Sequence, residues 1–533
     1  MDLAPEVAKR RTFAIISHPD AGKTTLTEKL LLYGGALHMA GSVKSRKASR
    51  HAVSDWMEME KEKGISITSS VLQFDYRERR LNLLDTPGHA DFSEDTFRTL
   101  AAVDSAIMLM DAAKGIEPRT LRLFEVCRMR NLPVITFINK MDRPGLEPLD
   151  LLDEVARTLN IRTTALNWPI GQDSDFRGVL DRVTRKVHLF ERDEAHGADV
   201  VPELILDLDD PQVRARVGDK LYQRLLDEDE LLAAAGDDWS VEDFLAGKVT
   251  PFYFGSAMTN FGVGPLLDAI VNLAPSPRPR EAATGHRDPT DAEFSGFIFK
   301  IQANMNPQHR DRIAFMRVVS GRFERGMEVS LARNPKRKVK LSKPHTFMAA
   351  ERSIVEDAIP GDIVGLYDNG DLRLADTLFV GQPIEFHGIP RFAPEHFARV
   401  RLKDPTKRKH LTNGLMQLSL EGTIQLFIRE GLGAADPYLG AVGLLQFEVL
   451  IQRLQSEYNV KAELQGSSFR CARWIGGDPR AIDWLAQRSD FVLVEDRDGL
   501  PVVLTESPWP LNFALAEAPG LELYEVSPLV SAN

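Results

Sequence analysis

SHPDAGKT, residues 17–24, is the stretch that decides the fold of this chain. It follows the phosphate-loop pattern G-x-x-x-x-G-K-S/T except at its first position, where Ser17 replaces glycine. The apolar, β-branched run RTFAIIS leads into it, and the helically spaced TLTEKLLLYGG follows it. A strand before the loop and a helix after it are the context that a phosphate loop requires. Taken alone, the stretch leaves open a glycine turn with a surface lysine.

The residue types of this loop suit the phosphates of a nucleotide. Backbone N–H groups of such a loop point inward and wrap the phosphates, and the helix N-terminus adds partial positive charge. Lys23 is expected to reach the β- and γ-phosphate oxygens, and the Thr24 hydroxyl is expected to ligate Mg²⁺. We therefore predict that the whole loop contacts the nucleotide: Ser17, His18, Pro19, Asp20, Ala21, Gly22, Lys23 and Thr24.

A second motif, DTPGH, ends the strand-like run RRLNLLD. A carboxylate at Asp85 can hold Mg²⁺ through water, and the Gly88 N–H can bond the γ-phosphate and sense its presence. Alone, the motif also suits a plain turn. Downstream of a phosphate loop, it predicts further nucleotide contacts from Asp85, Thr86, Pro87, Gly88 and His89.

A third motif, NKMD, ends the strand-like run LPVITFIN. The carboxylate of Asp142 can accept hydrogen bonds from the N1–H and N2–H₂ edge of guanine, whereas adenine offers a different edge. Asn139 is expected to tie the base loop to the phosphate loop, and the Lys140 stem to cover the base plane. In GSA (255–257), the Ala257 N–H is predicted to be available to guanine O6. The predicted ligand is GTP or GDP, contacted here by Asn139, Lys140, Met141, Asp142, Ser256 and Ala257.

These motifs follow strand-like runs in the order that a doubly wound, mostly parallel sheet requires, because such sheets bind ligands at the carboxyl ends of their strands. We predict an N-terminal α/β P-loop GTPase domain over residues 9–280, with an acidic helical insertion at about 165–250. Short strands with glycine turns predict a central antiparallel β-barrel, domain II, over 294–390. Mixed strands and helices predict an α+β C-terminal domain III over 391–533.

The composition excludes several classes of protein. With 533 residues, two cysteines and a net charge of −11, the chain has neither a disulfide framework nor a general nucleic-acid-binding charge. Its N-terminal apolar run is too short for a signal peptide, and no apolar run reaches the roughly 18 residues of a membrane span. We expect a cytoplasmic monomer that contacts neither membrane nor DNA.

The chain resembles the translational GTPases in five motifs, SHPDAGKTTLTEKLLL, EKGISITSS, DTPGHADFSEDTFRTL, NKMDRPG and FGSAMTNFGV. Within that family it is similar to the bacterial release-factor branch in DWMEMEKEKGISIT, FKIQANMNPQHRDRIAFMRVVSG and GAVGLLQFEVLIQRLQSEYNV. The likeness spans nearly the whole chain. Elongation factor G shares the GTPase and barrel pattern but is longer, and we do not expect its further C-terminal domains in this chain.

The resemblance implies catalytic roles for two residues. His89 resembles the histidine that positions the attacking water when the ribosome docks, although a histidine that merely begins the next helix is the alternative. Asp20 matches a loop aspartate associated with catalysis and ion placement. Pro19 and Ile65 fall where family members keep an apolar gate. Ser66 replaces the usual threonine ligand and keeps its hydroxyl, so the implied Mg²⁺ ligands are Thr24, Ser66 and Asp85.

The resemblance also implies an activity and its partners. A ribosome-dependent GTPase of this branch promotes dissociation of class I release factors from the ribosome after termination, and hydrolysis then frees it. Contacts with rRNA and ribosomal proteins are expected from the basic stretches 335–345, 406–410 and 44–51, although solvated surface charges explain these stretches as well. The alternatives are a translational GTPase of the elongation or back-translocation type, and a GTP-binding regulatory module with no ribosomal role.

Overall fold

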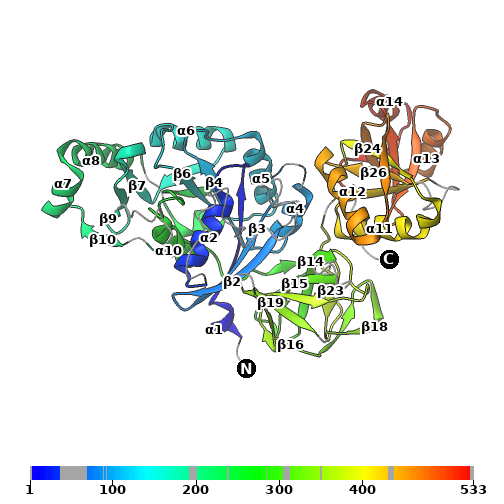
Figure 1. The fold of residues 1–533 in the computed structure, drawn as a ribbon, viewed down its shortest axis with the longest axis horizontal. Coiled ribbons are helices and arrows are strands. Elements are labelled where there is room, and N and C mark those ends of the chain that lie inside the picture. The colour runs from blue at the N-terminus through cyan, green and yellow to red at the C-terminus, as the bar shows by residue number, and fades with distance from the viewer. Residues whose placement is uncertain are drawn as a thin grey trace.

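The structure is a computed structural model in which the chain forms three blocks, each built around its own sheet (Figure 1). It describes residues 3–36, 69–87, 89, 91, 93–190, 200, 202–236, 239–283, 285–303, 312–341, 343–348, 351–389, 391–429 and 437–527. The predictions for Gly88, Ile65, Ser66 and the basic stretch 44–51 fall outside these residues. Among the described residues, no helix is both long and apolar enough to span a bilayer.

The N-terminal block is a seven-stranded sheet in the order β2-β3-β1-β4-β5-β11-β6. All neighbours run parallel except β2 and β3, as predicted for a doubly wound fold. The strands are β1 (Arg10–Ser17), β2 (Ser70–Tyr76), β3 (Arg79–Asp85), β4 (Ser105–Asp111), β5 (Val134–Asn139), β6 (Arg162–Ala165) and β11 (Val249–Phe254). The helices are α1 (Ala4–Val7), α2 (Lys23–Tyr33), α4 (Ser93–Leu100), α5 (Pro118–Met129), α6 (Pro148–Leu159) and α10 (Val263–Leu273).

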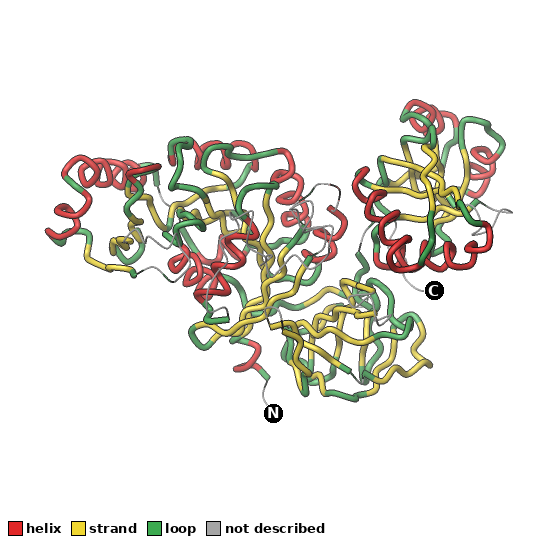
Figure 2. Tube along the Cα trace, in the orientation of Figure 1, coloured by secondary structure: helices red, strands yellow, loops and turns green. Residues whose placement is uncertain are grey.

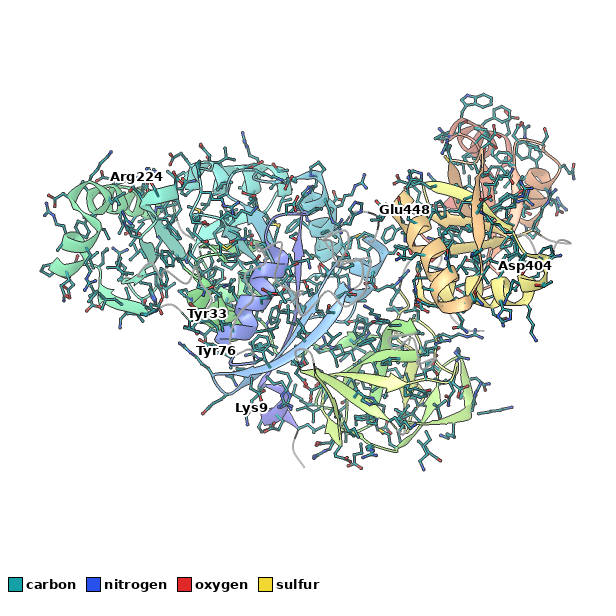
Figure 3. The ribbon with its side chains drawn as sticks, viewed as in Figure 1. Lys9, Tyr33, Tyr76, Arg224, Asp404 and Glu448 are labelled. Carbon is teal, nitrogen blue, oxygen red and sulfur yellow. The ribbon has the colours of Figure 1, made fainter. Side chains whose placement is uncertain are left out.

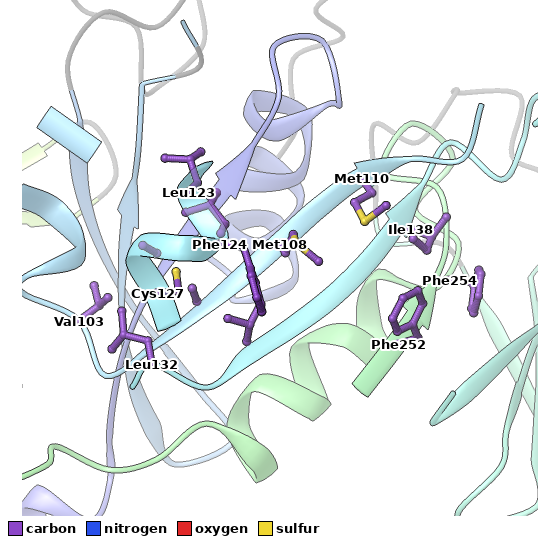
Figure 4. Close-up of a cluster of buried hydrophobic side chains, with 14 of the residues drawn as sticks. Val103, Met108, Met110, Leu123, Phe124, Cys127, Leu132, Ile138, Phe252 and Phe254 are labelled. Atoms are coloured by element: carbon purple, nitrogen blue, oxygen red, sulfur yellow. The ribbon is translucent and has the colours of Figure 1, made fainter. Parts of the chain in front are cut away.

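Strand β1 shows how the sheet is covered on both faces. Successive side chains of a strand point to opposite faces, so a central strand with helices on both sides is apolar throughout. Phe13 and Ile15 pack in one buried cluster with residues of α2 and α10, while Ala14 and Ile16 pack in another with residues of α5 and α6. Figure 4 shows part of the second cluster. Its member Cys127 is fully buried, which raises the pKa of the thiol to about 12.

Two tyrosines, Tyr33 and Tyr76, link α2 and β2 to the segment around α10 by hydrogen bonds (Figure 3). The Tyr33 hydroxyl, at the end of α2, donates to the Asn260 carbonyl at 3.3 Å. The Tyr76 hydroxyl, at the end of β2, donates to Asp268 of α10 at 2.8 Å. Burial, with the Asp268 carboxylate, raises the pKa of Tyr76 to about 12, so the phenol remains a donor at neutral pH.

The acidic segment is not the all-helical insertion that the sequence predicted. Its first half is a four-stranded antiparallel sheet in the order β10-β9-β8-β7, formed by β7 (Asn167–Ile170), β8 (Gly178–Asp181), β9 (Lys186–Phe190) and β10 (Glu203–Asp207). Only the second half is helical, with α7 (Pro211–Val217), α8 (Asp219–Ala234) and α9 (Val241–Leu245). The acidic composition obscured the strands, because KVHLF and ELILD are only five residues long and lie among charged residues, so neither gives a clear apolar period.

The central block is barrel-like, as predicted (Figure 2), and its paired strands all run antiparallel. Its eight-stranded sheet has the order β18-β17-β23-β14-β15-β22-β19-β20. The strands are β14 (Ser295–Ala303), β15 (Arg312–Ser320), β17 (Glu328–Leu331), β18 (Asn334–Lys340), β19 (Pro344–Met348), β20 (Glu351–Ile354), β22 (Ile363–Tyr367) and β23 (Thr377–Phe379). The short pairs β12 (Arg280–Glu281) with β13 (His286–Arg287), and β16 (Phe323–Glu324) with β21 (Asp357–Ala358), flank it.

The C-terminal block is α+β, which confirms the last part of the predicted fold class. Its antiparallel sheet has the order β27-β24-β26-β25-β29-β30-β28-β31. The strands are β24 (His396–Leu402), β25 (Gln425–Ile428), β26 (Tyr438–Ala441), β27 (Ala462–Gly466), β28 (Cys471–Gly477), β29 (Val492–Asp496), β30 (Pro501–Thr505) and β31 (Leu521–Tyr524). The helices are α11 (Arg408–Glu421), α12 (Leu444–Tyr458), α13 (Pro479–Ala486) and α14 (Trp509–Glu517).

Candidate nucleotide-binding site

The predicted site residues come from strands that end at one edge of the N-terminal sheet. Strands β3, β1, β4, β5 and β11 are successive parallel neighbours, so their carboxyl ends share that edge. The loop after β1 ends at Gly22, which precedes α2 with a φ of +101°. A Cβ on Gly22 would lie 2.3 Å from the Asn139 side-chain nitrogen. Glycine is therefore required here both by its backbone angle and by the close approach of a neighbouring loop.

Asn139, the last residue of β5, joins three loops. Its Nδ2 donates to the Ala21 carbonyl in the phosphate loop at 2.8 Å, and its Oδ1 accepts from the Ala257 N–H at 2.8 Å. The base loop and the 255–257 loop are also joined directly, because the Met141 N–H donates to the Gly255 carbonyl at 3.1 Å. These contacts join the phosphate loop, the base loop and the 255–257 loop.

The Ala257 N–H does not match its predicted role. The sequence suggested that this amide is available to guanine O6, but in the structure it donates to Asn139. The physical reason is that the buried Asn139 carbonyl oxygen needs a donor, and the adjacent loop supplies one. Ser256 supports the same loop, since its Oγ accepts from the Thr259 N–H at 3.2 Å.

Lys140 makes a second link between the base loop and the phosphate loop. Its Nζ donates to the Asp20 carbonyl at 2.5 Å and pairs with Asp111 Oδ2 at 2.7 Å. Both Lys140 and Asp20 have positive φ, at +68° and +65°. Asp111 ends β4, and the sequence reasoning missed it, although a carboxylate closing the buried run SAIMLMD was the available signal.

Asp142 has the property that a base-recognising carboxylate needs. Its Oδ1 is buried, and no described residue donates a hydrogen bond to it. Its Oδ2 lies 3.9 Å from Arg143 Nε, beyond hydrogen-bond distance. A buried acceptor left without a donor costs about 1–3 kcal/mol or more when charged. The N–H groups of a guanine base would remove that cost, so this carboxylate fits the predicted ligand.

The phosphate side is closed by an ion pair of the chain itself. Lys23 Nζ donates to Asp85 Oδ1 at 2.5 Å, and both side chains are almost fully buried. Thr86 holds the strand end in place, because its Oγ1 donates to the Ile15 carbonyl at 2.6 Å. Thr24 follows Lys23 at the start of α2 and is partly exposed. The lysine suits phosphate oxygens, and the hydroxyl and the carboxylate suit Mg²⁺.

Two buried polar atoms of the phosphate loop have no partner among the described residues, Ser17 Oγ and His18 Nδ1. The other ring nitrogen of His18 lies 3.2 Å from Glu117 Oε1. Glu117 precedes α5, and sequence reasoning did not single it out because no motif marks it. Unsatisfied buried atoms at a loop that also contains Gly22 fit a cradle for phosphate oxygens.

His89 is held by the residue two positions after it. Its Nδ1 accepts from the Asp91 N–H at 3.3 Å and lies 3.3 Å from Asp91 Oδ1. The other oxygen of Asp91 accepts from the Leu445 N–H at 2.7 Å, at the first turn of α12. Arg119 supports the preceding turn, since it donates to the Pro87 carbonyl at 3.0 Å. Burial lowers the pKa of Arg119 to about 10, which leaves it charged at neutral pH.

Helix α4, which follows His89, is bonded to both other blocks and faces the C-terminal one (Figure 1). Gln425 of β25 donates to Glu94 at 2.6 Å, and Arg98 donates to the Glu421 carbonyl at 3.2 Å. On the barrel side, Lys300 of β14 donates to the carbonyl of Ser69, whose N–H donates to Asp95 at 2.7 Å. The segment beside the predicted catalytic histidine is therefore a junction of all three blocks.

Two of the predicted basic stretches lie on the surface. Strand β18, which contains most of 335–345, is an edge strand and is exposed along nearly its whole length. Lys336 is exposed, and Lys338 donates to Ser330 Oγ at 2.7 Å. The stretch 406–410 is also largely exposed at the start of α11. Both are accessible, which suits a phosphate contact and an ordinary solvated edge equally well.

Comparison with known proteins covers all three blocks. Residues 8–276 match the family described as elongation factor Tu GTP binding domain, and residues 293–381 match elongation factor G domain 2. Residues 386–515 match the family described as class II release factor RF3, C-terminal domain.

Full-length relatives are similar throughout. Peptide chain release factor 3 of Symbiobacterium thermophilum is 53% identical over 97% of this chain and 98% of its own length. The protein of the same name from Gloeobacter violaceus is 51% identical over 99% of each chain. A crystal structure from Thermus thermophilus superposes with a TM-score of 0.68 at 23% identity, over 92% of this chain and 72% of the other, and supports the fold.

Proposed function

This chain belongs to the peptide chain release factor 3 family of translational GTPases, and from this premise we propose that it promotes dissociation of class I release factors from the ribosome after termination. The observation that carries the proposal is the similarity along the whole chain, including the release-factor C-terminal domain. We propose that it works as a cytoplasmic monomer, with units at 9–280, 294–390 and 391–533.

Guanine recognition is assigned to the base side of the site. Asp142 accepts from the N1–H and N2–H₂ groups of the base, and its unpartnered buried Oδ1 supports this role. Asn139 keeps the base loop and the phosphate loop at a fixed spacing through its bonds to Ala21 and Ala257. Because these bonds lie within the protein, the frame does not depend on the base.

Phosphate binding requires the ion pair between Lys23 and Asp85 to open. Lys23 then turns to the β- and γ-phosphate oxygens, and Asp85 becomes free to hold a metal through water. Thr24, Ser66 and Asp85 would hold Mg²⁺, which supplies neutralisation of the phosphate charge when it is bound. The exchange is feasible because each buried charge leaves one partner for another of opposite sign.

For hydrolysis, we assign His89 to the positioning of the attacking water and Asp20 to catalysis and ion placement. Pro19 and Ile65 form the apolar gate beside the histidine. Catalysis of phosphoryl transfer is chiefly positioning and charge stabilisation, so the ribosome acts by fixing this geometry. We expect hydrolysis to be slow in its absence. The ion pair between Lys300 and Asp95 of α4, and the hydrogen bond from Gln425 to Glu94 of α4, supply a path by which loss of the γ-phosphate relaxes the other domains.

The test uses purified ribosomes halted after peptide release and carrying a fluorescently labelled class I release factor. Addition of the protein with GTP is expected to accelerate loss of the label, whereas GDP does not. Unchanged dissociation with GTP contradicts the proposal. The alternative is an elongation-type or back-translocation-type factor, with which the chain shares the two domain families matched over residues 8–276 and 293–381. Movement of tRNA in a translocation assay, with no effect on the release factor, would establish that alternative.

A further inference from the structure

A cavity of about 550 Å³ lies between the N-terminal domain and the barrel, away from the nucleotide loops. Four arginines line it: Arg130 at the end of α5, Arg278 and Arg280 in the connection to the barrel, and Arg317 of β15. Only two carboxylates line it as well, those of Asp104 and Glu281. The cavity therefore has an excess of positive charge within a chain whose net charge is −11.

One of these arginines is neutralised directly by a carboxylate. Arg317 pairs with Asp104 Oδ2 at 2.6 Å. Arg278 donates to the Asn131 carbonyl at 3.0 Å, and Arg280 donates to the Ala101 carbonyl at 2.8 Å. These carbonyls are neutral acceptors, so they satisfy donors without cancelling the charge.

Arg130 is the arginine whose hydrogen-bond donors are least satisfied. Its terminal nitrogen donates to the Ala101 carbonyl only at 3.4 Å, and its Nε is buried with no acceptor among the described residues. Arg280 is fixed in place by aromatic rings, with its guanidinium carbon 3.8 Å from the centre of the Phe297 ring. The guanidinium groups are thus positioned before any ligand arrives, which reduces the entropy lost on binding.

The positive charges of these arginines also repel one another. Burial lowers the pKa of Arg130, Arg278 and Arg280 below the usual range. The positive charge of Arg317 lowers the pKa of each of them further. Since guanidinium groups stay protonated at neutral pH, the repulsion remains in the folded protein. An anion in the cavity would relieve it.

We propose that this cavity is a binding site for a small anion that carries two or more phosphoryl groups. The guanidinium fork matches phosphate oxygens in pairs, and forks from three separate segments around one cavity can each take a different phosphoryl group. The volume lies within the range of small-molecule sites. The ligand is either a free diphosphate or the diphosphate part of a nucleotide.

The site has a structural link to the GTPase machinery. Arg280 and Arg317 donate to the carbonyls of Ala101 and Ala102, which directly follow α4. An anion that accepts from these guanidinium groups competes with the two carbonyls, and so weakens the bonds that hold the end of that helix. Binding of the anion to the cavity does not depend on the proposed function. An effect of the anion on ribosome-stimulated GTP hydrolysis rests on that proposed function.

The experiment titrates inorganic pyrophosphate into full-length protein saturated with GDP and Mg²⁺, which occupies the nucleotide site. We expect a further binding event of one equivalent, weakened at least tenfold in the double variant Arg130→Gln with Arg278→Gln. The matched control, Arg322→Gln with Arg325→Gln, removes two exposed arginines of the barrel and should bind as wild type does. ADP in place of pyrophosphate distinguishes a nucleotide source from a free diphosphate.

Unaltered GDP affinity in both double variants shows that the nucleotide domain is folded. If the cavity variant does not fold, the wild type still decides: pyrophosphate should raise the unfolding midpoint of the GDP complex above that in chloride of equal ionic strength. The proposal is overturned if neither probe binds the GDP-saturated protein, or if a folded cavity variant binds pyrophosphate as tightly as the control.

Discussion

The base side and the phosphate side of the nucleotide site are built on different principles. On the base side, Asn139 is satisfied within the protein and Asp142 has a buried oxygen without a partner among the described residues. On the phosphate side, Lys23 and Asp85 satisfy each other. In the proposed function, the base side is thus a preformed frame, whereas the phosphate side exchanges one ion pair for another when the nucleotide binds. Specificity and catalytic switching are thereby assigned to separate parts of one site.

The largest expected effect tests the base side. In Asp142→Asn, the amide presents a donor to the guanine N–H edge, so preference should shift from GTP toward xanthosine triphosphate. A site that pairs fully with its substrate discriminates by about 10⁴–10⁵-fold, which sets the upper limit of the change. Competition binding of the two nucleotides measures it, with exposed Asp153→Asn on α6 as the control. Unchanged GTP affinity would show that Asp142 does not read the base.

The next effect separates binding from turnover. His89→Ala should retain GTP affinity, because the base frame and the loop around Lys23 are intact. Ribosome-stimulated hydrolysis should fall by about 10²–10⁴-fold, the range in which a positioned catalytic side chain contributes. Phosphate release measured with and without ribosomes tests this, with exposed His286→Ala as the control. Normal stimulated turnover in His89→Ala would remove the histidine from the mechanism.

A smaller effect is expected from removing the Asn139 link, which tests whether this link supports both base binding and phosphate binding. Asn139→Ala leaves the Ala21 carbonyl and the Ala257 N–H without their partner, at about 1–3 kcal/mol for each group. We expect GTP and GDP affinities to fall together by about 10–10²-fold with guanine preference retained. Titration of both nucleotides decides, and Asn272→Ala on the exposed side of α10 controls for loss of an amide. A loss confined to GTP would mean that Asn139 serves only the γ-phosphate.

The motifs and their order were enough to predict the parallel sheet, since each motif closes a buried strand. The link made by Asn139 could also be predicted from the sequence, because a short amide at a strand end can reach a neighbouring loop. The Ala257 N–H was misassigned because its competing acceptor lies more than a hundred residues away in the sequence. The strands of the insertion were missed because each is only four or five residues long and they lie in a strongly acidic segment, so no apolar period stands out.

Contacts between blocks are the part that sequence patterns could not reveal. Lys300, Gln425 and Leu445 lie in ordinary strand or helix sequence, yet their bonds converge around α4 and Asp91. The pairing depends on how three independently patterned domains pack, and no local period encodes that. The arginines of the interdomain cavity are distributed over residues 130–317 for the same reason.

The smallest effect probes the second link between the two sides. Lys140→Met keeps most of the apolar stem but removes the bonds to the Asp20 carbonyl and to Asp111. Because Asn139 still holds the loops together, we expect nucleotide affinity to fall only about three- to tenfold, near the 1 kcal/mol of one net hydrogen bond. A double variant with Asn139→Ala should lose more than the sum of the two single free-energy changes, since each link alone still holds part of the frame. Strict additivity in that cycle would mean that the two links act separately, and the base side would then be two local contacts rather than one preformed unit.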